Sequence, residues 1–218
     1  MGETGGVEER EVGVGPWPGG PTAWPDDPRY DQQLLAEGDR RNVVDRFRYW
    51  TVEAVVADLD TRRHPFHVAI ENWRHDLNIG SVVRTANAFL AAEVHIVGRR
   101  RWNRRGAMVT DRYQHLRHHG QVADLVGWAA TAGPDGTPLP LIGIDNVPGS
   151  VPLEGYPLPP ACVLLLGQEG SGLSDDAVAA CDAVLHIRQL GSTRSLNAGA
   201  AAAIAMHTWV VTHGEPAG

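Results

Sequence analysis

The chain contains no lysine, and all 19 of its basic residues are arginine. This absence excludes a phosphate-binding loop that depends on lysine, and it excludes covalent catalysis through a Schiff base. Arginine keeps its charge at any ordinary pH and binds phosphate through two parallel hydrogen bonds. Long apolar runs are missing too, since none reaches the ~18 residues of a membrane span. We therefore expect no membrane partner, and the first residues lack the apolar core of a signal peptide.

Cysteine is scarce, and both Cys162 and Cys181 have apolar neighbours. We interpret them as packed thiols in a reducing cytoplasm rather than as a disulfide or a redox pair. The glycines of residues 167–172 do not follow the dinucleotide fingerprint G-x-G-x-x-G. That absence argues against an NAD site and against a Rossmann-type methyltransferase.

Histidine is comparatively abundant, with ten residues. His64 and His67 have loosely ligand-like spacing, as do His115, His118 and His119. A zinc site needs a matched set of ligands, and no cysteine pair or acidic partner lies nearby in the sequence. We therefore expect no metal.

The net charge of −7 is unevenly distributed. Residues 1–60 hold 6 arginines and 13 acids, residues 61–121 hold 11 and 4, and residues 122–218 hold 2 and 9. A basic middle between acidic ends is the pattern expected for binding a polyanion. Its arginines are interleaved with Trp102 and Tyr113, which suits phosphate contact and base stacking. The predicted RNA-binding residues are Arg99, Arg100, Arg101, Trp102, Arg104, Arg105 and Arg112.

Apolar periodicity predicts alternating strands and helices. Strands are expected over residues 66–71, 94–97, 139–144, 162–166 and 183–188. Helices are expected over residues 50–60, 79–90, 120–131 and 196–211, with a short helix after Ser174. This order predicts an α/β fold in which a parallel sheet is flanked by helices on both faces. Residues 1–28 are expected to form a flexible N-terminal arm and residues 29–65 a helical extension.

Three motifs follow one another in the rest of the chain. N-x-G-x-x-x-R-T-A begins at Asn78, L-L-G-x-E-G-x-G-L begins at Leu165, and I-x-x-x-G-x-x-x-S-L-N begins at Ile187, before an alanine-rich segment. Together they resemble the motifs of the SpoU/TrmH branch of the SPOUT RNA methyltransferases. The resemblance covers residues 66–213, which we take as the methyltransferase domain. The chain departs from the family at Arg188 and Gln189, where Pro-Met is usual.

The resemblance implies a deep trefoil knot in the C-terminal third, a homodimer, S-adenosylmethionine (SAM) as cofactor, and tRNA or rRNA as substrate. The cofactor-binding residues that it implies are Gly143, Ile144, Gly167, Ile187, Leu190, Ser195 and Leu196. The catalytic residues that it implies are Asn78, Arg84, Glu169, Ser195 and Asn197.

The expected roles centre on Arg84. A guanidinium is a poor base, so we expect Arg84 to hold the phosphate beside the target ribose and to orient the 2′-hydroxyl. That phosphate, or a transiently neutral Arg84, would accept the proton. Asn78 is expected to cap the following helix and hold Arg84, and Glu169 to orient Arg84 or the substrate. Ser195 and Asn197 are expected to fix their loop and contact the cofactor or ribose.

Three functions remain open at this point. The first is methylation of a ribose 2′-hydroxyl, the second is methylation of a base nitrogen, and the third is a silent RNA-binding or assembly factor on the same scaffold. Motif one with Asn78 and Arg84 favours ribose. The complete set of candidate catalytic residues argues against a silent scaffold.

Overall fold

The computed structural model describes residues 13–73, 78–168 and 170–214. The chain divides into two compact units, and the boundary in the sequence falls between Ala57 and Asp58. None of the described helices has both the length and the apolar character needed to cross a bilayer. The second unit carries the sheet and all three sequence motifs, and it positions the candidate site.

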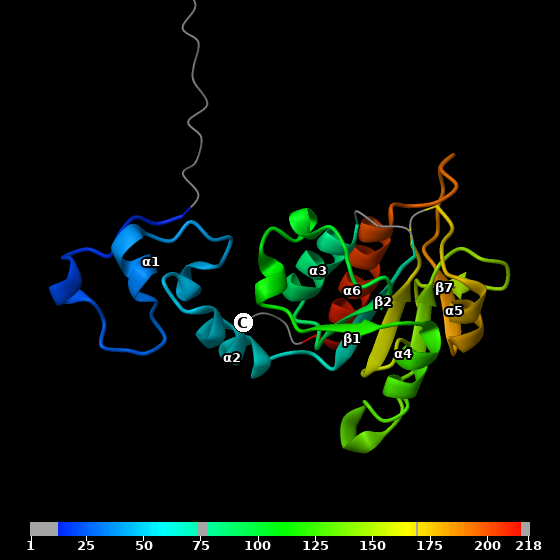
Figure 1. Ribbon diagram of the computed structural model, residues 1–218. Coiled ribbons are helices and arrows are strands. Elements are labelled where there is room, and N and C mark those ends of the chain that lie inside the picture. Colours follow the sequence, from blue (N-terminus) through cyan, green and yellow to red (C-terminus); the bar gives the residue numbers. More distant parts are fainter. Residues whose placement is uncertain (1–12, 74–77, 169, 215–218) are drawn as a thin grey trace, which may run out of the picture. The chain divides into compact units, whose positions relative to one another are not determined.

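Seven parallel strands form the sheet of the second unit (Figure 1). The strands are β1 (Phe66–Asn72), β2 (Val94–Gly98), β3 (Leu116–His119), β4 (Leu141–Ile144), β5 (Val151–Pro152), β6 (Cys162–Leu166) and β7 (Ala183–His186). Their order across the sheet is β3-β2-β1-β6-β4-β7-β5. The predicted parallel sheet is therefore confirmed. Because β6, β4 and β7 are neighbours, the loops that follow them emerge side by side at one edge.

Helices cover both faces of the sheet, as predicted (Figure 1). Helices α3 (Ile79–Ala88) and α6 (Ala198–His213) pack on one face, where Val82 and Trp209 join a core of strand residues. Helices α4 (Val122–Ala129) and α5 (Asp175–Ala180) pack on the other. The 3-10 turns are η1 (Pro21–Ala23), η2 (Asp45–Phe47), η3 (Arg104–Ala107), η4 (Thr110–Arg112) and η5 (Pro134–Gly136).

Two strands were not predicted. Strand β3 forms at the end of the basic middle segment, and β5 forms in the proline-rich stretch before β6. Both lie at sheet edges and are short, so their local sequences carry little alternation. The knot stays a prediction from the family resemblance.

The first unit is described from residue 13. It contains α1 (Gln32–Glu37) and begins α2 (Val52–Asp60), a helix predicted from its spacing. Residues 13–28, predicted as part of a mobile arm, instead contact the rest of this unit. The amide of Trp17 donates to the Leu35 carbonyl at 2.8 Å, and its ring lies edge-on to Tyr30 and Tyr49. Aromatic packing therefore orders a segment that composition alone marked as flexible.

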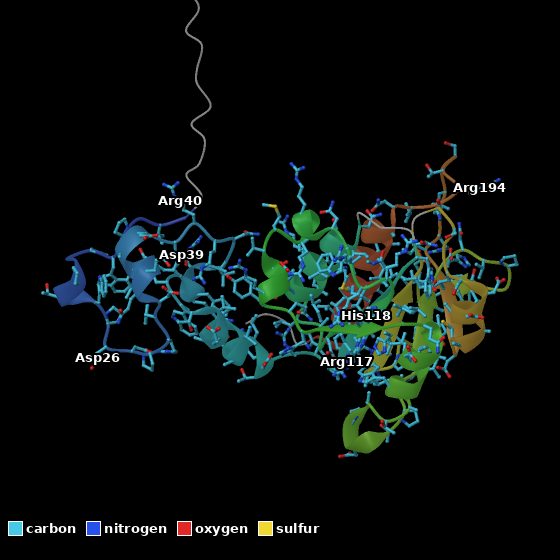
Figure 2. The ribbon with its side chains drawn as sticks, in the orientation of Figure 1. Asp26, Asp39, Arg40, Arg117, His118 and Arg194 are labelled. Carbon is cyan, nitrogen blue, oxygen red and sulfur yellow. The ribbon has the colours of Figure 1, made fainter. Side chains whose placement is uncertain are left out.

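A buried carboxylate, Asp39, organises the first unit (Figure 2). Its oxygens accept hydrogen bonds from the Arg41 guanidinium at 2.9 and 2.7 Å and from the Tyr49 amide at 2.9 Å. Burial raises the pKa of Asp39, but these hydrogen bonds outweigh it, and the pKa lies below its ordinary value of 3.8. The ionised form is therefore the one that holds the unit together.

Candidate functional site

A cleft of about 560 Å³ lies at the carboxyl edge of the sheet. It is built from the loops that follow β4, β6 and β7, together with the start of α6. Its lining residues are Ile144–Pro148, Leu166–Gln168, Gly170–Gly172, Ile187, Gln189, Arg194–Ala198 and Ala201. The loops of motifs two and three thus form one concave surface together with the loop after β4, which precedes both motifs in the sequence.

The glycine loop after β6 folds tightly back on itself. The Gly172 amide donates to the Gln168 carbonyl at 3.0 Å, and a Cβ at Gly167 would collide with the Gly172 backbone. Gly172 has φ +70°, and a Cβ there would collide with the Asp145 carboxylate. Only glycine fits this conformation and spacing, and the fit exposes main-chain groups to the cleft.

Two carboxylates fix the exit of this loop. Asp145 accepts a hydrogen bond from the Leu173 amide at 2.7 Å. Glu71, fully buried at the end of β1, accepts from the Ser174 amide at 2.8 Å and the Ser174 hydroxyl at 2.7 Å. Ser174 also caps α5 through the Ala177 amide, as predicted. Sequence analysis missed Glu71, although a lone acid ending an apolar strand is a signal that could have marked it.

Asn78 and Asn197 join motif one to motif three. The Asn197 side chain donates to Asn78 Oδ1 at 2.9 Å and accepts from the Gly199 amide at 2.9 Å, which caps α6. Asn78 stands at the N-cap position of α3, but its side chain makes no capping bond to that helix in the described part of the chain. The predicted capping role of Asn78 is therefore wrong. Its side chain instead ties the start of α3 to α6.

Small residues let these two helices approach closely. A Cβ at Gly199 would lie 3.4 Å from the Ser81 Cβ. On the other side of α3, a Cβ at Gly80 would lie 2.6 Å from the Ala107 amide nitrogen and 2.8 Å from Gly106 Cα. The glycine of motif one is thus required because the turn η3 packs directly against its backbone.

Arg84 lies on the exposed side of α3 and is not among the described residues that line the cleft. Ser81, three positions earlier, shares that side and faces the start of α6. Glu169 lies outside the described residues, so its predicted role stays a prediction.

Five of the seven predicted cofactor-binding residues line the cleft: Ile144, Gly167, Ile187, Ser195 and Leu196. The other two do not. Side chains of successive strand residues lie on opposite faces of a sheet, so a side chain at position 143 would lie on the face opposite to that of Ile144. A Cβ on Gly143 would lie 2.9 Å from Cys181 Sγ. Leu190 is 98% exposed.

All six arginines of the predicted RNA-binding set are exposed. Asn72, fully buried at the end of β1, holds their backbone by donating to the Arg99 carbonyl at 2.7 Å and the Arg101 carbonyl at 3.0 Å. Trp102 is half-buried, with the Arg104 guanidinium 5.7 Å from its ring. Sequence analysis missed Asn72 because its partners lie 27 and 29 residues away.

Tyr113 does not serve as the stacking residue that we expected. It is only 4% exposed. Its carbonyl accepts a hydrogen bond at 2.8 Å from Arg63, which anchors this turn to the start of the second unit. Base stacking at this surface is therefore limited to Trp102 among the aromatic residues that we named.

The cysteines are packed thiols, as predicted. Both are free, and burial raises the pKa of Cys162 and of Cys181 to about 12. Neither thiol is therefore reactive near neutral pH.

Comparison with known proteins agrees with this architecture. A Mycolicibacterium vanbaalenii protein named an uncharacterized tRNA/rRNA methyltransferase is 29% identical over 191 residues, which is 82% of this chain and 58% of that protein. The tRNA (guanosine(18)-2′-O)-methyltransferase of Escherichia coli is 25% identical over 158 residues, covering 71% of this chain and 67% of that enzyme.

A solved structure is similar as well. The SpoU methyltransferase AviRb from Streptomyces viridochromogenes, in complex with AdoMet, superposes with a TM-score of 0.62 at 25% identity. The match covers 71% of this chain and 60% of AviRb. The chain therefore spans less than two thirds of AviRb and of the M. vanbaalenii protein. The profile of the SpoU rRNA Methylase family matches residues 65–207, which contain all three motifs and every strand of the sheet. The chain belongs to the SpoU rRNA methylase family.

Proposed function

We propose that the protein is a SAM-dependent RNA methyltransferase that modifies a ribose 2′-hydroxyl of tRNA or rRNA. The observation that carries this proposal is the cleft in which the loops of motifs two and three converge, tied to motif one by the bond between Asn197 and Asn78. Two relatives support it, an E. coli enzyme named for 2′-O-methylation of a tRNA guanosine and AviRb in its complex with AdoMet. Because the proposed substrate is tRNA or rRNA, we propose that the protein acts in the cytoplasm.

The cleft suits the proposed cofactor in size and chemistry. Its volume of about 560 Å³ lies within the range of small-molecule sites. Ile144, Ile187 and Leu196 offer apolar contacts for an adenine ring, and the tight glycine loop offers main-chain donors and acceptors. SAM supplies a methyl group already activated by its sulfonium, and S-adenosylhomocysteine is the product. The protein must then position the hydroxyl and remove its proton.

Arg84 is the residue that we assign to positioning the substrate. Its exposed guanidinium suits two-point contact with the phosphate next to the target ribose, which would set the 2′-hydroxyl in line. The proton passes to that phosphate or to a transiently neutral Arg84. Because Arg84 lies outside its own cleft lining, we assign it to the cleft of a second subunit in a homodimer.

The outer side of α6 supports the dimer. Although Ala202, Met206 and Trp209 are buried, Ile204 is 40% and Val211 70% exposed on a helix that carries no Asp, Glu, Lys or Arg. An apolar surface of this kind on a helix that also packs in the core suits a subunit interface.

A nucleoside assay tests the function. Bulk RNA is incubated with the protein and labelled SAM, digested to nucleosides and separated. A 2′-O-methyl nucleoside is the expected product. A methylated base would replace the proposal with the base-nitrogen alternative, and no product together with RNA binding would indicate a silent scaffold.

The role of Arg84 has its own test. Arg84→Lys keeps the charge but loses the planar two-point contact, so we expect turnover to fall on the order of 100-fold. Arg62→Lys, at another exposed arginine of the same unit, is the matched control and should leave turnover unchanged. Near-wild-type turnover of Arg84→Lys would contradict the positioning role. Mixed dimers of Arg84→Ala with a cleft variant should regain activity only if the arginine serves the partner's site.

A further inference from the structure

Three histidines from neighbouring strands meet on the face of the sheet that α4 covers. His67 of β1 and His95 of β2 approach with Nδ1 and Nε2 3.1 Å apart, and His95 Nδ1 lies 3.0 Å from Nε2 of His119 in β3. His95 is fully buried and His119 is 6% exposed. The sequence spacing had grouped His67 with His64, and His119 with His115 and His118. The fold instead pairs residues 28 and 24 positions apart.

A carboxylate completes the group. Glu93 Oε2 lies 3.8 Å from His95 Nε2, and one donor atom each from His67, Glu93 and His95 falls within 4.8 Å of the others. Two nitrogens bound to one zinc ion at ~2.0–2.1 Å in a tetrahedron lie about 3.3 Å apart. The two imidazole nitrogens are already within a few tenths of an ångström of that spacing. Two imidazoles and a carboxylate are also a common zinc donor set.

We propose that His67, His95 and Glu93 form a binding site for a divalent transition metal ion, Zn²⁺ being the ion that fits best, with a water molecule as the fourth ligand. The ion would link the N-terminal ends of β1 and β2 and hold these two strands together. The open side is available because His67 and Glu93 are only partly buried.

His119 orients the central ligand. With a metal on its Nε2, His95 carries its proton on Nδ1, from where it donates to His119 Nε2 at 3.0 Å. Metal-binding histidines characteristically make such a bond with their other ring nitrogen. Trp128 of α4 covers the group, with its ring centroid 4.1 Å from that of His95 and 4.9 Å from that of His67. The three rings are thus held in place before an ion binds.

The charges around the group set its affinity. Arg117 of β3 donates through Nε to both Glu93 oxygens, at 3.2 and 3.1 Å. Each carboxylate oxygen keeps a further lone pair for an ion, so this bond can persist in the bound state. The positive charge of Arg117 opposes a cation, whereas the carboxylate of Asp124 in α4, which acts on His119, favours one.

The site is independent of the proposed methyl transfer. His67 and His95 are each the second residue of their strand, whereas the cleft lies beyond the opposite, carboxyl ends of β4, β6 and β7. The α4 face also differs from the face on which α3 and α6 pack. Binding of Zn²⁺ can thus be measured without reference to RNA, SAM or turnover.

The test uses the full chain without a histidine tag, freed of metal with a chelator and then desalted. Calorimetric titration with ZnCl₂ should give one ion per chain, and zinc should raise Tm. Replacing the zinc with Co²⁺ should produce the visible absorption of a tetrahedral site. His67→Gln and Glu93→Gln should each lower zinc affinity on the order of 100-fold. His119→Gln should lower it by about 10- to 100-fold.

A neighbouring histidine provides the control. His118→Gln changes the residue of β3 that precedes His119. His118 is exposed and lies outside the group, so this change should leave zinc affinity unchanged. Arg117→Gln, which removes the opposing charge, should tighten binding. Circular dichroism spectra that match wild type identify the folded variants, and Glu93→Gln, at a partly exposed position, keeps the test open if His67→Gln does not fold. Absence of stoichiometric binding, or equal affinity in wild type and Glu93→Gln, would overturn the proposal.

Discussion

Replacing Glu71 by glutamine tests whether one buried carboxylate holds the glycine loop of the cleft. Glu71 Oε1 accepts from Trp73 Nε1 at 2.7 Å and from the Ser174 hydroxyl at 2.7 Å, while Oε2 accepts from the Ser174 amide at 2.8 Å. Because all three partners act as donors here, the NH₂ group of glutamine must turn towards at least one of them. In the best orientation the glutamine oxygen takes the place of Oε1 and keeps both of its bonds. The glutamine NH₂ group then faces the Ser174 amide, which is also a donor and loses its acceptor.

The cost follows from that one lost bond. A hydrogen bond to a charged group contributes about 1.5–3 kcal/mol, and a buried unsatisfied donor costs about 1–3 kcal/mol. We therefore expect Glu71→Gln to lower the free energy of unfolding of the second unit by about 3 kcal/mol. For a unit of this size Tm should fall by about 6–12 °C. SAM affinity should fall on the order of tenfold, since a loosened loop must be ordered again when the cofactor binds.

Urea unfolding followed by circular dichroism measures the first quantity, and calorimetric titration with SAM measures the second. Asp176→Asn is the matched control, because Asp176 is an exposed carboxylate on α5, the helix that Ser174 caps. It should change stability by less than about 1 kcal/mol, because an acidic side chain in the first turn of a helix contributes about 0.3–1 kcal/mol. A Glu71→Gln protein as stable as this control would refute the reasoning. Lost stability with unchanged SAM affinity would show that Glu71 supports the sheet but not the loop.

Three further perturbations test other parts of the chain. The lowered pKa of Asp39 contributes stability to the first unit that is present above its ordinary value of 3.8 and is lost as pH falls through the folded pKa. Asp39→Asn should remove this acid-sensitive transition and lower the free energy of unfolding of the first unit by about 3 kcal/mol at pH 7, measured by near-ultraviolet circular dichroism. An unchanged loss of stability at low pH would show that Asp39 is not the group responsible. Gly172→Ala should abolish SAM binding in calorimetry while the sheet stays folded, because a Cβ meets the Asp145 carboxylate; normal affinity would show that the loop can rearrange. Arg104→Gln should reduce by about 1 the slope of the logarithm of the RNA-binding constant against the logarithm of salt concentration, whereas Arg62→Gln should not. Equal slopes in the two variants would show that Arg104 does not contact the RNA.

Local patterns determined most elements of the second unit. The apolar run Cys162–Leu166 is a buried strand, Ser174 caps a short helix, and the helical spacing after Asn78 forms α3. Each of these depends on neighbours a few residues away, because strand alternation and helix capping are short-range effects. The three motifs, read together, also indicated the family and five residues of the cleft.

Longer-range partners decided the rest. The Glu71 carboxylate binds a serine 103 residues later, and Asn197 binds an asparagine 119 residues earlier. Tyr113 is buried although its segment is basic, and the His67–His95 pair exists only because β1 and β2 are neighbours in register. The sequence by itself determined which short segments are strands or helices and which family they belong to. Only the tertiary structure decided which polar groups face one another, because pairing across a sheet depends on strand order and register rather than on distance along the chain.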